Sequence, residues 1–502
     1  MISVLAMQSA ALPSVSAPVI WVVAIVYFVG VAAIGVWATR RTRTAKDFFV
    51  AGGGIGLWPA ALSTMAATIS GFSFIGGPGL VYTVGTGAMF LMLPAALTAA
   101  MGAWVLAKRM RLLGEFRGLI TVPDALRVRY DSRAAQGLSA VAILLAIIGY
   151  MATNVLALGL VIDSIFGTGL AAGIWIGTGI TLAYTVAGGI MAGIYTDVFQ
   201  GALMAFASVL VFGFALKTGG GMDAISTSIL AERPELMGPW GAMGPVAALS
   251  FFFVFGMGSL GQPHVVHKFY MLRDPKRLKW MPLLTSGAIL LTVLLYYSVG
   301  VGMRALVARG QLPPLENADL ATPIFLLRFT PMFLAGLVFA GIAAAIMSTV
   351  NAFMNVGAAV LTHDIPTALG RKTGNELFRG RVYTVVISVL AALLALYSGT
   401  LVAFLGIFGW GLFTSTLVPA LAFGLNWQGA TREGAIASIM TGLVVTLSLE
   451  AMAWFKLLSF PTGVTVSGLS LVLSILMFFG VSWLTRGRAR EIDPIVRLVM
   501  EA

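Results

Sequence analysis

The sequence has no cysteine among its 502 residues and only three histidines. Disulfide bonds, thiolate metal sites and a cysteine nucleophile are therefore excluded. Charge is also scarce: Asp, Glu, Lys and Arg make up 10% of the chain, against roughly 25% in an average soluble domain. A soluble protein of this length needs far more polar surface, so these absences exclude an ordinary soluble fold.

Hydrophobic residues make up 59% of the chain, and they gather in long runs. A helix that crosses the hydrocarbon core of a bilayer needs about 20 apolar residues. The sequence therefore predicts an all-α polytopic membrane protein with about 13 transmembrane helices. The segments lie at approximately 18–39, 54–80, 86–107, 136–162, 168–189, 192–216, 245–266, 281–304, 331–361, 382–398, 400–425, 434–455 and 463–484.

The net charge of +12 is unevenly placed, because 25 of the 31 Lys and Arg residues fall in alternate loops or in the C-terminal tail. Cytoplasmic loops carry an excess of Lys and Arg. This rule predicts an inner-membrane protein with its N-terminus outside and its C-terminus in the cytoplasm. The basic charge is then a topology signal, and we expect a lipid bilayer around a monomer rather than a nucleic-acid partner.

Two of the predicted helices are interrupted by glycine and proline. Residues 66–71 lead into Gly-Gly-Pro-Gly at 76–79, and glycines at 256–261 precede Gln262 and Pro263. Both residue types weaken a helix and free backbone groups, which membrane depth tolerates only beside protein or a water-filled cavity. Close-packing glycines are the alternative explanation. Paired breaks in two halves of a chain indicate an inverted-repeat transporter with a central site.

The breaks divide the chain into four expected parts. An extra helix and loop occupy 1–53, and the two five-helix repeats occupy 54–216 and 217–425. Two further helices and a short tail occupy 426–502. Because each repeat holds an odd number of helices, the second is inverted relative to the first. The sequence therefore predicts a five-plus-five core.

Ala345, Ser348 and Thr349 share one face of a predicted helix, at spacings of three and four residues. A carbonyl beside two hydroxyls supplies neutral oxygen ligands, which suit a hard monovalent cation. The alternative is that both hydroxyls bond to their own helix or join neighbouring helices.

Asp197 lies near the start of the sixth predicted helix. An acid inside the bilayer costs roughly 2.5–3.5 kcal/mol, and such residues usually face a cavity or a cation. The alternative is an interfacial carboxylate one turn into the membrane. We expect it to have no base or metal partner at depth.

Five stretches together resemble the sodium:solute symporter family, and most closely its proline-type branch. They are 47–52, 70–79, 195–200, 261–264 and 345–349, and the likeness covers nearly the whole chain. The resemblance implies a secondary active transporter rather than an enzyme, with sodium as the coupling ion. It also implies import of a compact amino acid or a monocarboxylate. A sodium/sugar symporter and a proton-coupled carrier with Asp197 as relay remain alternatives.

The resemblance also carries over an ion site. It implies that sodium is bound by the carbonyls of Ala66, Ile69 and Ala345 and by the hydroxyls of Ser348 and Thr349.

Two departures from the family pattern concern a second ion and the solute. Some members bind a second sodium near an acid that matches Asp197, but here the neighbouring hydroxyl positions hold Asn351 and Ala352. Proline carriers have an acid where this chain has Thr68.

For the solute, the resemblance implies a cavity between the two breaks with aromatic gates beside it. Its lining is expected from Thr68, Ser70, Ser73, Tyr150, Phe255, Ser259 and Gln262, with Phe404 or Trp410 as gates.

Overall fold

The computed structural model describes residues 18–40, 55–271, 279–371, 374–399, 401–458, 460, 464–488 and 491–501, and its regular elements are helices. The 47–52 stretch of the family resemblance lies outside the described residues. The first half of the chain forms α2 Pro18–Thr39, α4 Leu57–Thr68, α5 Gly77–Val84, α6 Met89–Gly102, α7 Lys108–Arg117, α8 Val122–Tyr130, α9 Arg133–Phe166, α10 Leu170–Gly219, α11 Met222–Glu232 and α12 Gly244–Gly258. The second half forms α13 Pro263–Val266, α14 Met281–Ala308, α15 Ala321–Phe329, α16 Met332–Ala359, α17 Ile365–Ala368, α18 Glu376–Tyr397, α19 Val402–Leu417, α20 Arg432–Trp454, α21 Val466–Thr485 and α22 Pro494–Glu501.

The described residues contain 11 helical stretches that are long and apolar enough to cross a membrane, so the polytopic all-α class is confirmed and the count of 13 is not. The difference arises at two places. One span, Phe72–Thr98, runs across predicted segments 54–80 and 86–107. The segments 168–189 and 192–216 both lie in the single 50-residue element α10.

Both predicted breaks are present. Helix α4 ends at Thr68, Ile69 is extended (φ −84°, ψ 119°), and a π-helical turn, Phe72–Gly76, precedes α5. Helix α12 ends at Gly258, and α13 begins at Pro263. A side chain at Gly258 would place its Cβ 2.0 Å from Trp410 Nε1, so glycine is required for α12 and α19 to approach this closely.

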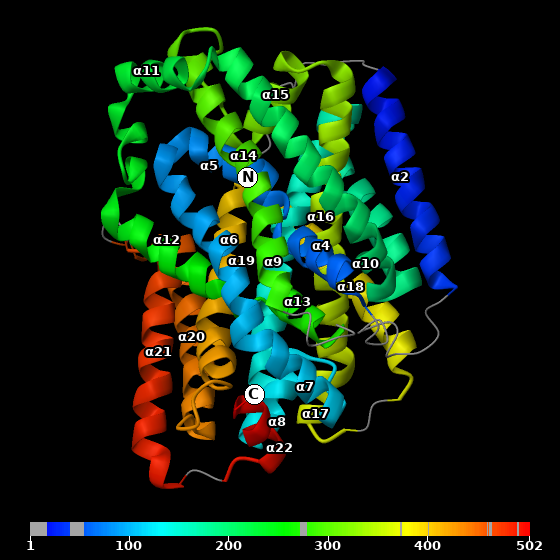
Figure 1. The fold of residues 1–502 in the computed structure, drawn as a ribbon, viewed down its shortest axis with the longest axis vertical. Coiled ribbons are helices and arrows are strands. Elements are labelled where there is room, and N and C mark those ends of the chain that lie inside the picture. The colour runs from blue at the N-terminus through cyan, green and yellow to red at the C-terminus, as the bar shows by residue number, and fades with distance from the viewer. Residues whose placement is uncertain are drawn as a thin grey trace.

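The helices form an elongated bundle whose two ends differ (Figure 1). Helix α2 flanks one side, and α20 and α21 pair on the other. Helices α7, α8, α17 and α22 gather at the lower end of the view, whereas α11 and α15 lie at the upper end. The basic stretches at 108–133, 486–488 and 491–497 therefore lie at the same end. We call it the basic end.

Candidate functional site

The five oxygen-bearing residues predicted for the ion site come together where α4 ends against the middle of α16. The Ser348 hydroxyl donates to the carbonyls of Ala66 (2.7 Å) and Ala345 (2.9 Å). Thr349 Oγ1 lies 3.3 Å from the carbonyl oxygen of Ile69 and 3.2 Å from that of Ala345. All five residues are fully buried. The five residues that the family resemblance implies therefore lie together in one cluster of oxygens.

The cluster draws its carbonyls from a helix end. Because α4 stops at Thr68, the carbonyls of its last turn lack partners within the helix, and they carry the negative end of the helix dipole. The carbonyl of Ala67, 3.2 Å from Thr349 Oγ1, belongs to the same turn and was not predicted. Carbonyls and hydroxyls with no formal charge fit a monovalent cation better than a divalent one.

Asp197 is buried, but it has a partner that the sequence analysis missed. Its Oδ2 accepts from Lys268 Nζ at 2.9 Å and from the Ser63 hydroxyl at 2.5 Å. Lys268 also donates to the carbonyl of Ser63. The expectation that Asp197 has no base beside it was therefore wrong: Lys268 reads in the sequence as one of the basic loop residues, yet both side chains of the pair are only 3% exposed.

The Lys268–Asp197 pair links three elements that are far apart in the sequence. Ser63 lies on α4, Asp197 on α10, and Lys268 in the turn after α13. Removing one member of a buried pair leaves an uncompensated charge, which costs about 3–5 kcal/mol. The pair therefore joins the first half of one broken helix to the second half of the other through α10.

Asn351, the other residue considered for a second ion, is buried on α16. Its side-chain carbonyl accepts from Asn355 Nδ2 at 2.9 Å. A side chain at Gly193 of α10 would place its Cβ 1.9 Å from Asn351 Nδ2, so Asn351 packs directly on the helix that carries Asp197. Asn351 thus contributes to α10–α16 packing.

An aromatic stack connects the two breaks. Phe255 packs on Phe72 (5.8 Å between ring centroids) and on Trp410 (5.1 Å, 11° between planes). Tyr150 meets Trp410 edge to face at 6.2 Å, and its hydroxyl lies 3.4 Å from that of Ser70. The stack forms one wall of a narrow cavity with a free volume of about 10 Å³, enough for about one water molecule. Its lining is Thr68, Phe72, Ser73, Met92, Ala95, Tyr150, Phe255, Ile289 and Trp410.

A second narrow cavity, also with a free volume of about 10 Å³, shares Thr68 and Trp410 with the first. It is lined by Thr64, Thr68, Gly102, Ser259, Gln262, Val265, Phe269, Met281, Thr285 and Trp410. We call the two the aromatic cavity and the polar cavity. None of the described residues that line them is charged. Six of the seven predicted solute residues line one or both, and Ser70 contacts Tyr150.

The two predicted gates are placed differently. Trp410 is buried and lines both cavities, and its ring nitrogen donates to the carbonyl of Val254 at 3.2 Å. Phe404 is 57% exposed and lines neither cavity. Only Trp410 is placed to separate the cavities. The sequence analysis also missed Asn154. Its side-chain oxygen accepts a hydrogen bond from the backbone amide of Gly71 at 2.8 Å. One of the amides at the first break is therefore already paired.

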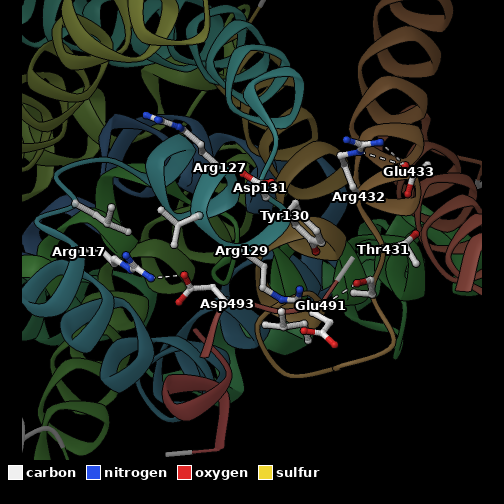
Figure 2. Close-up of a pocket in the computed structure, with 14 residues that line it drawn as sticks. Arg117, Arg127, Arg129, Tyr130, Asp131, Thr431, Arg432, Glu433, Glu491 and Asp493 are labelled. Carbon is white, nitrogen blue, oxygen red and sulfur yellow. Dashed lines mark hydrogen bonds and ion pairs between the residues drawn. The ribbon is translucent and has the colours of Figure 1, made fainter. Parts of the chain in front are cut away.

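A much wider cavity lies elsewhere, at the basic end (Figure 2). It has a volume of about 570 Å³ between α8, the start of α20 and the residues before α22. Figure 2 shows acidic and basic side chains interspersed around it, with Arg117 paired to Asp493 and Arg432 to Glu433. Partial burial opposes ionisation of Asp493, but hydrogen bonds from Arg117 and from two backbone amides hold its pKa below the usual range. The Arg117–Asp493 pair attaches the start of the C-terminal helix α22 to the end of α7.

Comparison with known proteins shows what the chain resembles. The model of the sodium:solute symporter family matches residues 48–442. The osmoregulated proline transporter OpuE of Bacillus subtilis is 28% identical over 93% of this chain and 94% of its own length. The sodium/proline symporter of Escherichia coli is also 28% identical, over 93% and 95%. The sodium/pantothenate symporter of Escherichia coli is 27% identical, over 90% and 94%.

Solved structures share the fold. The substrate-bound, outward-open state of a Na⁺-coupled sialic acid symporter superposes with a TM-score of 0.76 at 20% identity, covering 94% of this chain and 98% of that one. The nucleobase-cation-symport transporter Mhp1 gives a TM-score of 0.55 at 15% identity, over 91% and 99%. The predicted inverted-repeat transporter core with two broken helices is therefore confirmed.

Proposed function

The chain belongs to the sodium:solute symporter family, and on that premise we propose that it imports a compact amino acid of the proline type with one sodium ion. Sodium-coupled symport of a small solute is common to the family and to the relatives above. The identity of the solute, the ion ligands and the stoichiometry are our proposal.

The observation that carries the ion part is the oxygen cluster between α4 and α16. Ala66, Ile69, Ala345, Ser348 and Thr349 bind the sodium in this proposal. Entry of the ion turns the two hydroxyls from the carbonyls toward the cation. The site also joins the broken helix to α16, so binding of the ion orders the break beside the aromatic cavity. Asp197, held by Lys268, maintains the geometry of α10 without being a ligand.

The free energy released by one sodium ion per cycle is enough to accumulate the solute against its concentration gradient. One positive charge that enters down 100 mV releases about 2.3 kcal/mol, and each tenfold solute gradient costs about 1.4 kcal/mol. The membrane potential alone then sustains roughly 40-fold accumulation. A sodium gradient adds to this.

The solute part rests on the aromatic cavity. That cavity is closed in this structure, with a free volume of about 10 Å³, so we expect it to widen when the solute binds. Phe72, Phe255 and Trp410 supply an apolar wall for a ring or short aliphatic side chain. Hydroxyls of Ser70, Ser73 and Tyr150 supply donors for a carboxylate. Two of the relatives are named as proline carriers, which supports a solute of this class.

The placement in the membrane is also part of the proposal. We assign the basic end to the cytoplasm, with the C-terminus there and the N-terminus outside, because cytoplasmic loops carry the excess of Lys and Arg. The chain acts as a monomer in an inner membrane in this proposal, and the four parts 1–53, 54–216, 217–425 and 426–502 are its units.

The test is uptake of labelled L-proline by proteoliposomes under an imposed sodium gradient. Unlabelled compact amino acids should compete, whereas galactose and glucose should not. A proton gradient without sodium should give no uptake. Competition by hexoses while every carboxylate fails would contradict the proposed solute, and uptake driven by protons alone would contradict the proposed ion.

A further inference from the structure

We infer that the basic end carries a site for a divalent transition-metal cation such as Zn²⁺, formed by Asp124, His363 and Asp364. Each of the three offers one ligand atom, and these atoms all lie within 4.8 Å of one another. The inference goes beyond the proposed symport and does not depend on it, because the site shares no residue with the oxygen cluster or with the lining of the aromatic cavity.

Two helices that are far apart in the sequence supply these three side chains. Asp124 lies in the first turn of α8, where its backbone amide donates to the capping hydroxyl of Thr121 at 3.2 Å. His363 and Asp364 lie in the π-helical turn Val360–Asp364, which follows α16 directly and leads into α17. Because α8 and α17 gather at the basic end, the metal site lies there too (Figure 1). Single π-helical turns within helices occur frequently at functional sites.

The imidazole of His363 lies between two carboxylates. Its Nε2 is 3.1 Å from Asp124 Oδ2, and its Nδ1 is 3.6 Å from Oε1 of Glu376, the first residue of α18. A histidine that binds a metal through one ring nitrogen almost always donates its other N–H to a carboxylate, a carbonyl or a water. Glu376 is placed to accept that bond and to orient the ring, so that Nε2 faces the metal together with Asp124.

The separations of the ligand atoms fit a small cation after a modest closure. Zinc bonds to nitrogen and oxygen measure about 2.0–2.2 Å, so two ligands of a tetrahedral ion lie roughly 3.4 Å apart. His363 and Asp124 are already that close. The Asp364 carboxylate has to approach them by about an ångström at most, because no pair of ligand atoms exceeds 4.8 Å.

Two wholly buried side chains at the site have an oxygen without a hydrogen-bond partner among the described residues. Asp364 Oδ1 accepts from the Thr121 hydroxyl at 2.6 Å, but Asp364 Oδ2 has no partner. Gln136 of α9 donates its amide nitrogen to Asp124 Oδ1 at 3.0 Å, and Gln136 Oε1 has no partner. Asp364 and Gln136 are both 0% exposed. Buried polar atoms are nearly always paired, so unpaired acceptors beside two acids point to a cation as their ligand.

The donor set selects the class of ion. One imidazole nitrogen and two carboxylates, with the Gln136 oxygen as a fourth ligand, suit zinc and its neighbours in the transition series. Mg²⁺ and Ca²⁺ take oxygen ligands instead. The two carboxylates carry two negative charges, which a divalent ion cancels. The alternative cation at this place is the protonated ring of His363 itself, which would pair with the acids and exclude a metal.

The experiment titrates Zn²⁺ into the purified full chain, without an affinity tag and after washing with a chelator, and measures the heat of binding. The wild type should bind one Zn²⁺ per chain, and its melting temperature should rise with the zinc concentration. Loss of an outer partner of a metal ligand typically costs 10–100-fold in affinity. Glu376→Gln should therefore weaken binding about tenfold, and His363→Gln or Asp364→Asn, which each remove a ligand, at least about 100-fold.

Asp493→Asn is the matched control, because Asp493 is also a paired acid at the basic end and lies outside the metal site. Its affinity for zinc should equal that of the wild type. If the wild type binds no zinc, the inference is overturned and the protonated ring is the cation. If His363→Gln and Asp364→Asn bind as tightly as the control, zinc is an adventitious ion only, which also overturns the inference. Should one of these two variants fail to fold, the other and Glu376→Gln decide. Sodium-driven uptake is measured separately, so the proposed symport stands in either case.

Discussion

Replacing both hydroxyls of the oxygen cluster tests the ion site directly. The variant is Ser348→Ala with Thr349→Val, which removes two of the five proposed ligands and keeps the shape at Thr349. Both side chains are fully buried on α16. Bulk water therefore does not replace the two oxygen ligands that the variant removes. We expect sodium-dependent transport to remain measurable, because three carbonyl ligands stay, but to require much more sodium.

The size of the effect follows from the bonds that each hydroxyl exchanges. An oxygen that contacts a charged group contributes about 1.5–3 kcal/mol, and a neutral hydrogen bond about 0.5–1.5 kcal/mol. Ser348 gives up its bonds to Ala66 and Ala345 when it turns to the ion, so the net gain is about 1 kcal/mol per hydroxyl. Two hydroxyls together correspond to an increase of tenfold or more, about 30-fold, in the half-saturating sodium concentration.

The assay is proline uptake by proteoliposomes across a series of sodium concentrations. The matched control is Thr384→Val with Ser388→Ala on α18. Those hydroxyls are also fully buried, but each bonds only to a carbonyl of its own helix, at 2.8 and 2.6 Å. If the half-saturating sodium concentration is the same in the α16 variant, the control and the wild type, the cluster does not bind the coupling ion.

Three further predictions concern buried charged residues. Asp197→Asn should slow transport and still leave one charge per solute, measured as the ratio of current to uptake; a ratio of two in the wild type would refute the single site. Lys268→Met alone should destabilise the protein by about 3–5 kcal/mol, and adding Asp197→Asn should recover most of that loss; equal melting of both variants would contradict the ion pair. At the upper end, burial raises the pKa of Asp319 to about 6, although the carboxylate accepts a hydrogen bond from the Val402 amide (2.8 Å). Because the folded pKa exceeds the unfolded value of 3.8, folding favours the protonated acid, so its ionisation costs up to about 3 kcal/mol above pH 6. The apparent melting temperature should therefore rise between pH 7 and pH 4, relative to Asp319→Asn; identical pH profiles would contradict the assignment.

The oxygen cluster shows how far local pattern reaches. The spacing of Ala345, Ser348 and Thr349 placed three oxygens on one helix face, and the break after Thr68 marked where carbonyls are freed. Only the family resemblance indicated that the oxygens of α16 meet the carbonyls at the end of α4. The two sets are about 280 positions apart in the sequence, and no local pattern relates them. The carbonyl of Ala67 was missed for the same reason: which carbonyls of a last turn face a partner depends on how the helix is rotated.

Composition, hydrophobic runs and glycine–proline breaks determined by themselves the membrane class, the helical content and the two interruptions, since each follows from the solvation of single segments. Only the tertiary structure decided which charges are paired and which polar atoms share a cavity. Lys268 reads as one basic residue of a loop, yet the packing of α4, α10 and the turn after α13 buries it against Asp197. Thr64 and Thr285 read as ordinary helix hydroxyls until α4 and α14 meet beside Gln262. Burial and pairing depend on long-range packing, and no segment of the sequence carries that information alone.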